Sequence, residues 1–139
     1  MEVRKCGASE TAFEAPDIVH LKLVGSVTLD ECVLINDAHL GWGEGRSHVF
    51  YMIDLSELAD IPAAVRRAAS ETVKMLPLRG TVIYNSPLRA RVLGKLLLTA
   101  GNLFRRGAAP NPVEFVDTED DARAWVEIRR RQIASEKVS

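Results

Sequence analysis

The stretch Val49-Phe50-Tyr51-Met52-Ile53-Asp54-Leu55, preceded by His48, decides the fold because it is apolar without a break until Asp54. An antiparallel strand with one solvated face alternates between apolar and polar residues. A continuous apolar run of this length is typical of a central parallel strand that helices cover on both faces. The run therefore predicts an α/β protein.

Downstream of this strand, helical and strand patterns alternate. Pro62 begins a helix in which apolar residues recur at helical spacing. Residues 80–84 form a second buried strand, and Ser86-Pro87 begins a long helix that reaches about Phe104. A short strand over residues 113–116 precedes a closing helix. Its apolar stripe contains Ala122, Trp125, Val126 and Ile133, and we expect Trp125 to be a core anchor.

Upstream, the pattern predicts an antiparallel hairpin and one helix. A weak strand over residues 11–15 leads through Pro16-Asp17 into an alternating strand over residues 19–24. Thr28 and Glu31 form a capping box, which begins a helix that contains Cys32 as a small buried residue. Gly41 is expected to end this helix.

The predicted order is β-β-α-β-α-β-α-β-α: a mostly parallel five-stranded sheet, an antiparallel edge hairpin and about four helices. The length of 139 residues suits a single domain over residues 1–139, with residues 1–10 and 134–139 as loose ends. The net charge of -1 gives no general attraction to nucleic acid. The chain shows neither a signal peptide nor an apolar run for stable membrane insertion, and its two cysteines suggest reduced thiols in the cytoplasm.

This order of elements resembles the STAS domain, the fold of anti-sigma-factor antagonists and sulfate-transporter tails. Asp54-Leu55-Ser56 is similar to the segment that these domains carry at the end of a buried strand. The second half resembles a bacterial STAS-like branch related to CRAL-TRIO lipid-transfer domains. That similarity rests on Asp54-Leu55-Ser56, the helix over residues 62–76, residues 81–84, and residues 115–119 leading to Ala122-Arg123-Ala124-Trp125.

One feature of the family is missing. Anti-sigma-factor antagonists carry a phosphorylated serine where the helix after the Asp-Leu-Ser strand begins, whereas this chain has Asp60-Ile61-Pro62-Ala63 there. The resemblance therefore implies no phosphoswitch at this position, although Ser56 and Ser70 lie nearby in the sequence.

The long helix from Pro87 supplies the candidate partner-binding face. A helical wheel places its large apolar residues on one arc, which we expect to face the core. The opposite arc carries Arg91, Lys95, Leu98 and Asn102. This arc is either a solvated basic face or a docking face. Ala90, Gly94 and Gly101 form an edge of small residues where the closing helix or a second subunit could approach closely, which also allows a homodimer.

A ligand crevice is the second candidate, because ligands bind at the carboxyl ends of parallel strands. The residues expected there are Asp54, Ser56, Asn85, Ser86 and Arg89. The simpler interpretation, which we favour, is that Asp54 holds loop amides and Ser86 caps its helix.

No motif for a cofactor, a metal or catalysis emerges. Gly41-x-Gly-x-Gly follows a helix and precedes a strand, the wrong order for a phosphate loop. His20, His39 and His48 lack metal-ligand spacing, and no nucleophile and base stand together.

The sequence leaves three functional hypotheses. The first is a non-catalytic bacterial regulatory module that binds a protein partner through a helical face, as the resemblance implies. The second is a binder of a lipid or another apolar small molecule, as the CRAL-TRIO kinship implies. The third, which the sequence supports least, is an enzyme.

Overall fold

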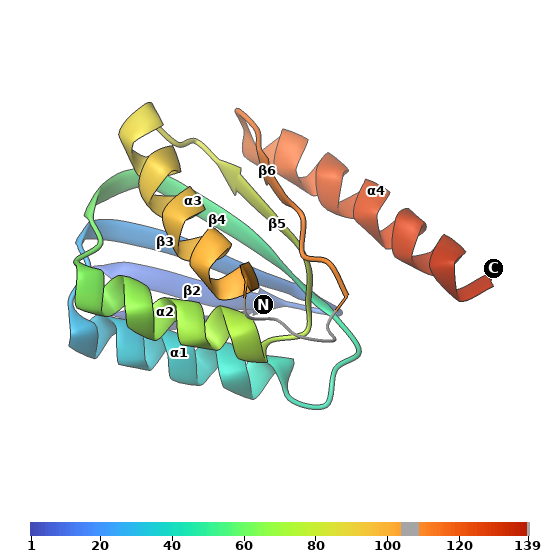
Figure 1. Ribbon diagram of the computed structural model, residues 1–139, viewed down its shortest axis with the longest axis horizontal. Helices are drawn as coiled ribbons and strands as arrows, with labels where there is room; N and C mark the ends of the chain where they lie inside the picture. Colours follow the sequence, from blue (N-terminus) through green and yellow to red (C-terminus); the bar gives the residue numbers. More distant parts are fainter. Residues whose placement is uncertain (104–108, 139) are drawn as a thin grey trace.

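The computed structural model describes residues 1–103 and 109–138 as a mixed sheet with helices on both faces (Figure 1). The six strands follow one another across the sheet in chain order. The elements are β1 (Glu2–Cys6), β2 (Ser9–Glu14), β3 (Ile18–Ser26), α1 (Leu29–Gly43), β4 (Val49–Asp60), α2 (Ala63–Met75), β5 (Leu78–Tyr84), α3 (Leu88–Leu103), β6 (Val113–Phe115) and α4 (Glu119–Val138).

The sheet contains six strands, not the five expected, because the first residues are not loose. β1 pairs antiparallel with β2, from Glu2 opposite Phe13 to Cys6 opposite Ser9. The sequence hid this strand because only Cys6 is buried and the other residues are exposed and mostly charged, as is typical of a protected sheet edge. At the other end, α4 continues to Val138, so residues 134–138 of the expected loose end are helical, and Ser139 lies outside the described residues.

The predicted parallel sheet with an antiparallel edge is confirmed. β1, β2 and β3 are antiparallel, and β3, β4, β5 and β6 are parallel. β4 lies inside the sheet and is covered on both faces. Tyr51, Ile53 and Leu55 belong to the core under α1, α2 and α3, and Phe50 and Met52 belong to the core under α4.

The start of α1 was predicted correctly. The Thr28 hydroxyl accepts the Glu31 amide at 3.1 Å, and the Glu31 carboxylate accepts the Thr28 amide at 3.1 Å. Cys32 is buried as expected. The helix continues beyond Gly41 to Gly43, because Trp42 packs against His39 and Phe13 and so extends the buried face.

α4 packs as its apolar stripe predicts. Ala122, Val126 and Ile133 are buried against the sheet. Trp125 lies over Gly80, where an added Cβ would come within 2.9 Å of the indole ring, but the side chain remains partly exposed. The expectation of a core anchor therefore holds for the part of the ring that covers Gly80.

α3 is rotated relative to its predicted wheel. Its buried residues are Ala90, Gly94, Leu98 and Gly101. Of the large apolar residues expected in the core, Leu93 and Leu97 are partly buried against it, whereas Leu88, Val92, Leu96 and Leu103 are exposed. Small residues face inward because the helix lies very close to its neighbours. A Cβ on Gly101 would lie 2.6 Å from Val73 of α2, and a Cβ on Gly94 would lie 3.1 Å from Leu55 of β4. The neighbours of this edge are thus α2 and the sheet, and not the closing helix. The predicted end of the helix at Phe104 falls outside the described residues.

Candidate functional site

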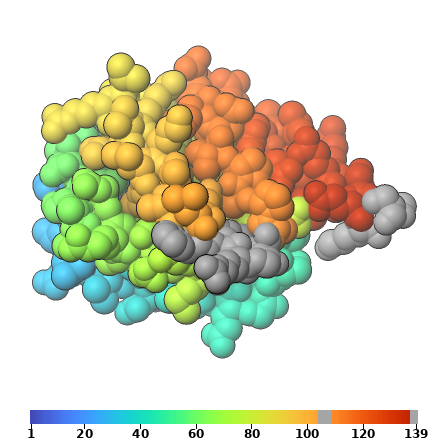
Figure 2. Space-filling view, viewed as in Figure 1, coloured from blue at the N-terminus to red at the C-terminus, as the bar shows by residue number. Residues whose placement is uncertain are grey.

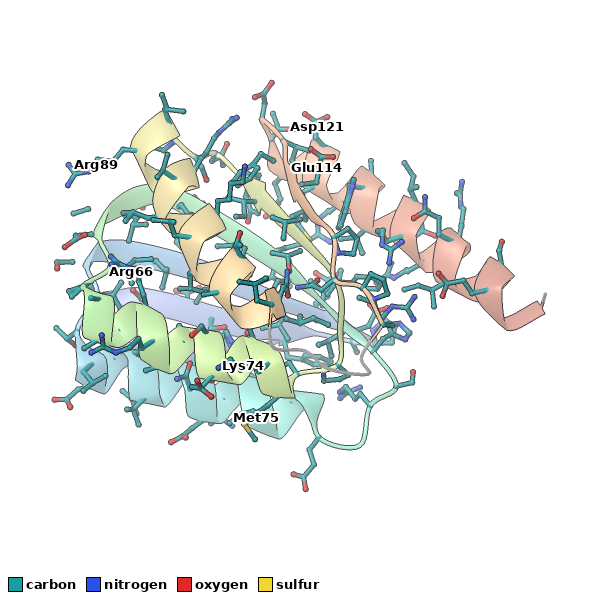
Figure 3. All side chains as sticks on the ribbon, in the orientation of Figure 1. Arg66, Lys74, Met75, Arg89, Glu114 and Asp121 are labelled. Carbon is teal, nitrogen blue, oxygen red and sulfur yellow. The ribbon has the colours of Figure 1, made fainter. Side chains whose placement is uncertain are left out.

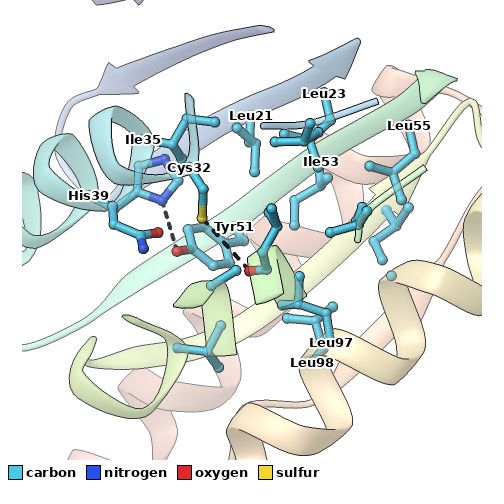
Figure 4. A pocket seen from close by; sticks show the side chains of 18 residues that line it. Leu21, Leu23, Cys32, Ile35, His39, Tyr51, Ile53, Leu55, Leu97 and Leu98 are labelled. Carbon is cyan, nitrogen blue, oxygen red and sulfur yellow. Dashed lines mark hydrogen bonds between the residues drawn. The ribbon is translucent and has the colours of Figure 1, made fainter. Parts of the chain in front are cut away.

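An apolar cavity of about 70 Å³ lies between the sheet and the three helices α1, α2 and α3 (Figure 4). We call it the interior cavity. β3, β4 and β5 form its floor, and the three helices form its walls. Its lining residues are Leu21, Leu23, Val27, Cys32, Ile35, Asn36, His39, Tyr51, Ile53, Leu55, Ile61, Val65, Ala69, Val73, Ile83, Gly94, Leu97 and Leu98.

Local sequence explains why the floor is apolar. Alternate residues of a strand point to the same face, so Tyr51, Ile53 and Leu55 all face the cavity. On the side of the cavity opposite the sheet, α3 contributes Gly94, Leu97 and Leu98. Figure 4 shows the side chains of Leu97 and Leu98 pointing from α3 toward the lining residues of the sheet.

One end of the cavity carries a buried chain of hydrogen bonds. The Thr11 hydroxyl donates a hydrogen bond to the carbonyl oxygen of His20 at 2.6 Å. Because a hydroxyl has only one hydrogen to donate, Thr11 accepts its second hydrogen bond from Nε2 of His39 at 2.8 Å. Nδ1 of a neutral His39 then accepts from the Tyr51 hydroxyl at 2.9 Å (Figure 4). The Tyr51 oxygen keeps its acceptor capacity.

The pKa values of His39 and Tyr51, the two titratable side chains in this row of hydrogen bonds, indicate that both are uncharged. Burial lowers the pKa of His39 to about 3, because the charged ring would lose its hydration. Burial also raises the pKa of the Tyr51 phenol, with a smaller contribution from Cys32. Both side chains therefore stay uncharged near neutral pH and act as fixed hydrogen-bonding groups.

The other polar lining residues are also uncharged. The Cys32 thiol contacts the carbonyl oxygen of Val65 at 3.8 Å, and burial raises the pKa of this thiol. The Asn36 amide donates to the carbonyl oxygen of Ala68 at 3.2 Å. Among the residues that the structure describes, no Lys, Arg, Asp or Glu lines the cavity. A charge brought into it would be desolvated without a counter-ion, so the cavity suits an uncharged group.

A second hollow lies outside the cavity, between α2 and α3. This outer groove, with a volume of about 210 Å³, is lined by Ala63, Arg66, Arg67, Ser70, Leu96, Leu97 and Ala100. Leu97 also lines the interior cavity. Among the described residues, Leu97 therefore borders both the cavity and the outer groove.

The expected partner-binding face is not assembled as predicted. Leu98 is only 2% exposed and lines the interior cavity, so it cannot contact a partner on the surface. The reason is the rotation of α3 that the glycines permit. Lys95 is exposed, but Arg91 and Asn102 contact their own chain.

The contacts of these two residues involve the segment that leads through β6. Nε of Arg91 donates to the carbonyl oxygen of Ser86 at 3.0 Å, and the guanidinium lies 3.7 Å from the Asp117 carboxylate. Asn102 and Asn111 exchange two hydrogen bonds of 3.2 Å. Through Asp117 and Asn111, Arg91 and Asn102 therefore hold α3 to the segments on either side of β6.

The expected ligand crevice is not assembled either. Asp54 lies in a shallow hollow on the α4 side of the sheet together with Tyr84 and Arg123, and Ser56, Asn85, Ser86 and Arg89 do not line this hollow. Asp54 accepts the Ser56 amide at 2.8 Å, in agreement with the simpler interpretation.

The expected cap at Ser86 differs from its prediction. The Ser86 hydroxyl donates to the carbonyl oxygen of Tyr84 at 2.9 Å instead of accepting a helix amide. Asn85, in the same turn, adopts a positive φ of 53°. The turn after β5 is therefore held by the Ser86 hydroxyl and by a hydrogen bond from the Asn85 amide to the carbonyl oxygen of Asp117 at 3.2 Å.

Sequence reasoning missed the interior cavity because no motif marks it. Its residues come from three strands, three helices and the segments joining them, so their side chains meet only in the fold. One signal was available: Gly94 and Gly101 lie on one edge of α3, and this spacing indicates a close approach. Among the described residues, no group of His, Cys, Asp or Glu could hold a metal ion, and no helix has the length and hydropathy to cross a bilayer.

Comparison with known proteins bears on the fold. No protein-family model matches the chain, and no curated protein matches it. The chain is similar to the crystal structure of an uncharacterized protein of the DUF3478 family with a SpoIIAA-like fold, from Shewanella loihica PV-4. The TM-score is 0.62 at 16% identity, and the match covers 89% of this chain and 93% of that chain. The fold is SpoIIAA-like. This confirms the expected STAS-like architecture, whereas the kinship with CRAL-TRIO domains stays a prediction.

Proposed function

We propose that this SpoIIAA-like protein is a non-catalytic binder of a small, uncharged, apolar molecule. The observation that carries the proposal is the interior cavity, in which apolar side chains surround one cluster of neutral polar groups. Ligand sites have this composition, because apolar walls provide affinity and a few polar groups fix orientation.

The volume of the cavity limits what fits without movement. An engineered protein cavity of about 150 Å³ binds benzene or xenon. A space of about 70 Å³ suits a smaller group, such as the end of an alkyl chain. A longer ligand would extend past Leu97 into the outer groove, which requires α2 and α3 to separate there.

The polar end of the cavity favours a ligand with a hydroxyl group. The Tyr51 hydroxyl already donates its hydrogen bond to His39, so the Tyr51 oxygen can accept a hydrogen bond from a ligand. A carboxylate would lack a cation among the described lining residues. We therefore favour medium-chain alcohols and similar neutral amphiphiles over fatty acid anions.

The chemistry of the lining groups supports binding and not catalysis. A nucleophile requires an activated thiolate, alkoxide or amine. The pKa of Cys32 is raised by burial, so the thiol stays protonated. His39 is held between Thr11 and Tyr51, and therefore has no free position for a substrate proton.

Binding of a protein partner, the first hypothesis from the sequence, is placed second. Its predicted face included Leu98, which is buried, and Arg91 and Asn102, which contact their own chain. Lys95 alone of that face is freely exposed.

The test is a calorimetric titration of the protein with straight-chain alcohols of about six to twelve carbons. Wild-type protein should bind, and Ala69→Leu should weaken binding about tenfold because the added carbons fill the cavity that Ala69 lines. Ala64→Leu is the matched control, since Ala64 lies on the same helix and is exposed. The proposal fails if no alcohol binds, or if Ala69→Leu binds as tightly as the control.

A further inference from the structure

The outward face of α3 carries four large aliphatic side chains that align along the helix. We call Leu88, Val92, Leu96 and Leu103 the outer row. Their exposed fractions are 78%, 52%, 55% and 73%. At about 100° per residue they fall within about 80° of one another, so one flat surface could contact all four.

The packing of α3 within the protein does not explain why the outer row is exposed. Single exposed apolar residues are common, but an aligned row along a whole helix marks an interaction surface. α3 has a SpoIIAA-like sheet beneath it and α2 beside it, and both contact its small-residue edge. Figure 2 shows α3 lying open across the near face of the molecule.

The charges around the row are basic. α2 and α3 together carry six basic residues and one acidic residue, although the whole chain has a net charge of -1. The basic residues are Arg66, Arg67, Lys74, Arg89, Arg91 and Lys95, of which Arg91 is paired with Asp117 at 3.7 Å. The acidic residue, Glu71, is paired with Lys74 at 2.6 Å.

Basic side chains flank the row on both sides. On the wheel, Lys95 lies beside one border of the row and Arg89 beside the other. Arg66 and Arg67 line the outer groove with Leu96. Figure 3 shows Arg66 and Arg89 extending on the same side of the molecule, whereas the labelled acidic residues Glu114 and Asp121 lie beyond α3, near β6 and α4.

We propose that the outer row docks the protein on the surface of an anionic membrane. Helices that lie in the interface between lipid headgroups and acyl chains combine an aliphatic face with flanking Lys and Arg. Protein interfaces draw most of their affinity from Trp, Tyr and Arg, and Leu and Val are under-represented among such residues. The outer row contains no aromatic residue. The inference does not depend on occupancy of the interior cavity.

The test is flotation of the intact protein with vesicles of phosphatidylcholine alone and with about 30% phosphatidylglycerol added. Wild-type protein should float with the anionic vesicles, and added salt should release it. The double variant Leu88→Ser with Leu96→Ser should bind the anionic vesicles with an affinity at least about tenfold lower, because two aliphatic contacts are lost. Arg89→Glu with Lys95→Glu should abolish the preference for anionic vesicles.

A matched control uses Leu34→Ser, which removes an exposed leucine of α1 outside the row. Its binding should equal that of wild type, and all variants should keep the circular dichroism spectrum because the changed residues are exposed. The inference is overturned if wild type does not float, or if Leu34→Ser loses as much binding as the double leucine variant. It is also overturned if sedimentation velocity shows a dimer or protein complex that Leu88→Ser with Leu96→Ser dissociates while vesicle binding is unchanged.

Discussion

α3 and α4 pack on opposite faces of the same sheet, but they meet it with different kinds of residue. α4 buries Ala122, Val126 and Ile133, the stripe that helical periodicity predicts. α3 buries mainly small residues and leaves four large aliphatic residues in solvent. The difference follows from distance, because glycine lets α3 approach Val73 and Leu55 more closely than a larger residue would allow.

This contrast shows when a hydrophobic wheel fails. The wheel assumes that the largest apolar residues face the core, which holds when a helix packs at an ordinary distance. When small residues line the contact, the wheel assigns the large residues to the wrong side. Those residues then become candidates for binding another surface.

The sharpest test of the contrast is a pair of neighbouring leucines. Leu98→Ala should lower the free energy of unfolding by about 3 kcal/mol, because Leu98 is buried. Leu96→Ala should change it by less than about 0.5 kcal/mol, because Leu96 is 55% exposed. Urea denaturation measures both. The reverse order would restore the wheel derived from the sequence.

The close approach of α3 can be broken at Gly101. Gly101→Leu should cost about 2–3 kcal/mol, because even its Cβ would lie 2.6 Å from Val73. Ala100→Leu is the control on the adjacent, exposed position and should be nearly neutral. Equal melting temperatures for the two variants would show that α3 does not depend on close packing at this residue.

On α4, the comparison residues are Trp125 and Ile128. Trp125→Ala should cost about 2 kcal/mol, less than for a fully buried aromatic residue, because the indole covers Gly80 but is partly exposed. Ile128 is 51% exposed, and Ile128→Ala should have little effect. Chemical denaturation of both variants checks this, and a neutral Trp125→Ala would mean that α4 is held without the indole.

The buried hydrogen bonds that join Thr11, His39 and Tyr51 predict a pH dependence of stability. The pKa of His39 is about 3 in the folded protein and near 6.5 in the unfolded chain, so the unfolded state binds more protons between these values. The free energy of unfolding should therefore fall by on the order of 1–2 kcal/mol as the pH drops from 7 to 5.

The control for this effect is His39→Gln, which removes the titrating ring. Its overall stability should be lower, since Thr11 and Tyr51 lose a partner, but its slope between pH 7 and 5 should be flatter than that of wild type. The range stops at pH 5 because Glu14, whose pKa is lowered to about 2 chiefly by a hydrogen bond from Arg123, contributes below it. Identical slopes would contradict the role assigned to His39.

Much of the fold followed from local patterns. The continuous apolar run of β4, the capping box of α1 and the stripe of α4 each depend on nearby residues, and each was predicted correctly. β1 was missed because a charged edge strand has no apolar pattern, and its pairing with β2 appears only in the sheet. The sites were predicted poorly, because the cavity depends on the distance between α3 and the sheet, which local periodicity does not contain.

The most direct test of the account is a methyl NMR titration of the leucine-labelled protein with octan-1-ol. We expect shifts at Leu97 and Leu98, which line the interior cavity, and much smaller shifts at Leu88 and Leu103, which are exposed on the opposite side of α3. Shifts confined to Leu88 and Leu103, with Leu97 and Leu98 unchanged, would contradict both the proposed ligand site and the orientation of the helix.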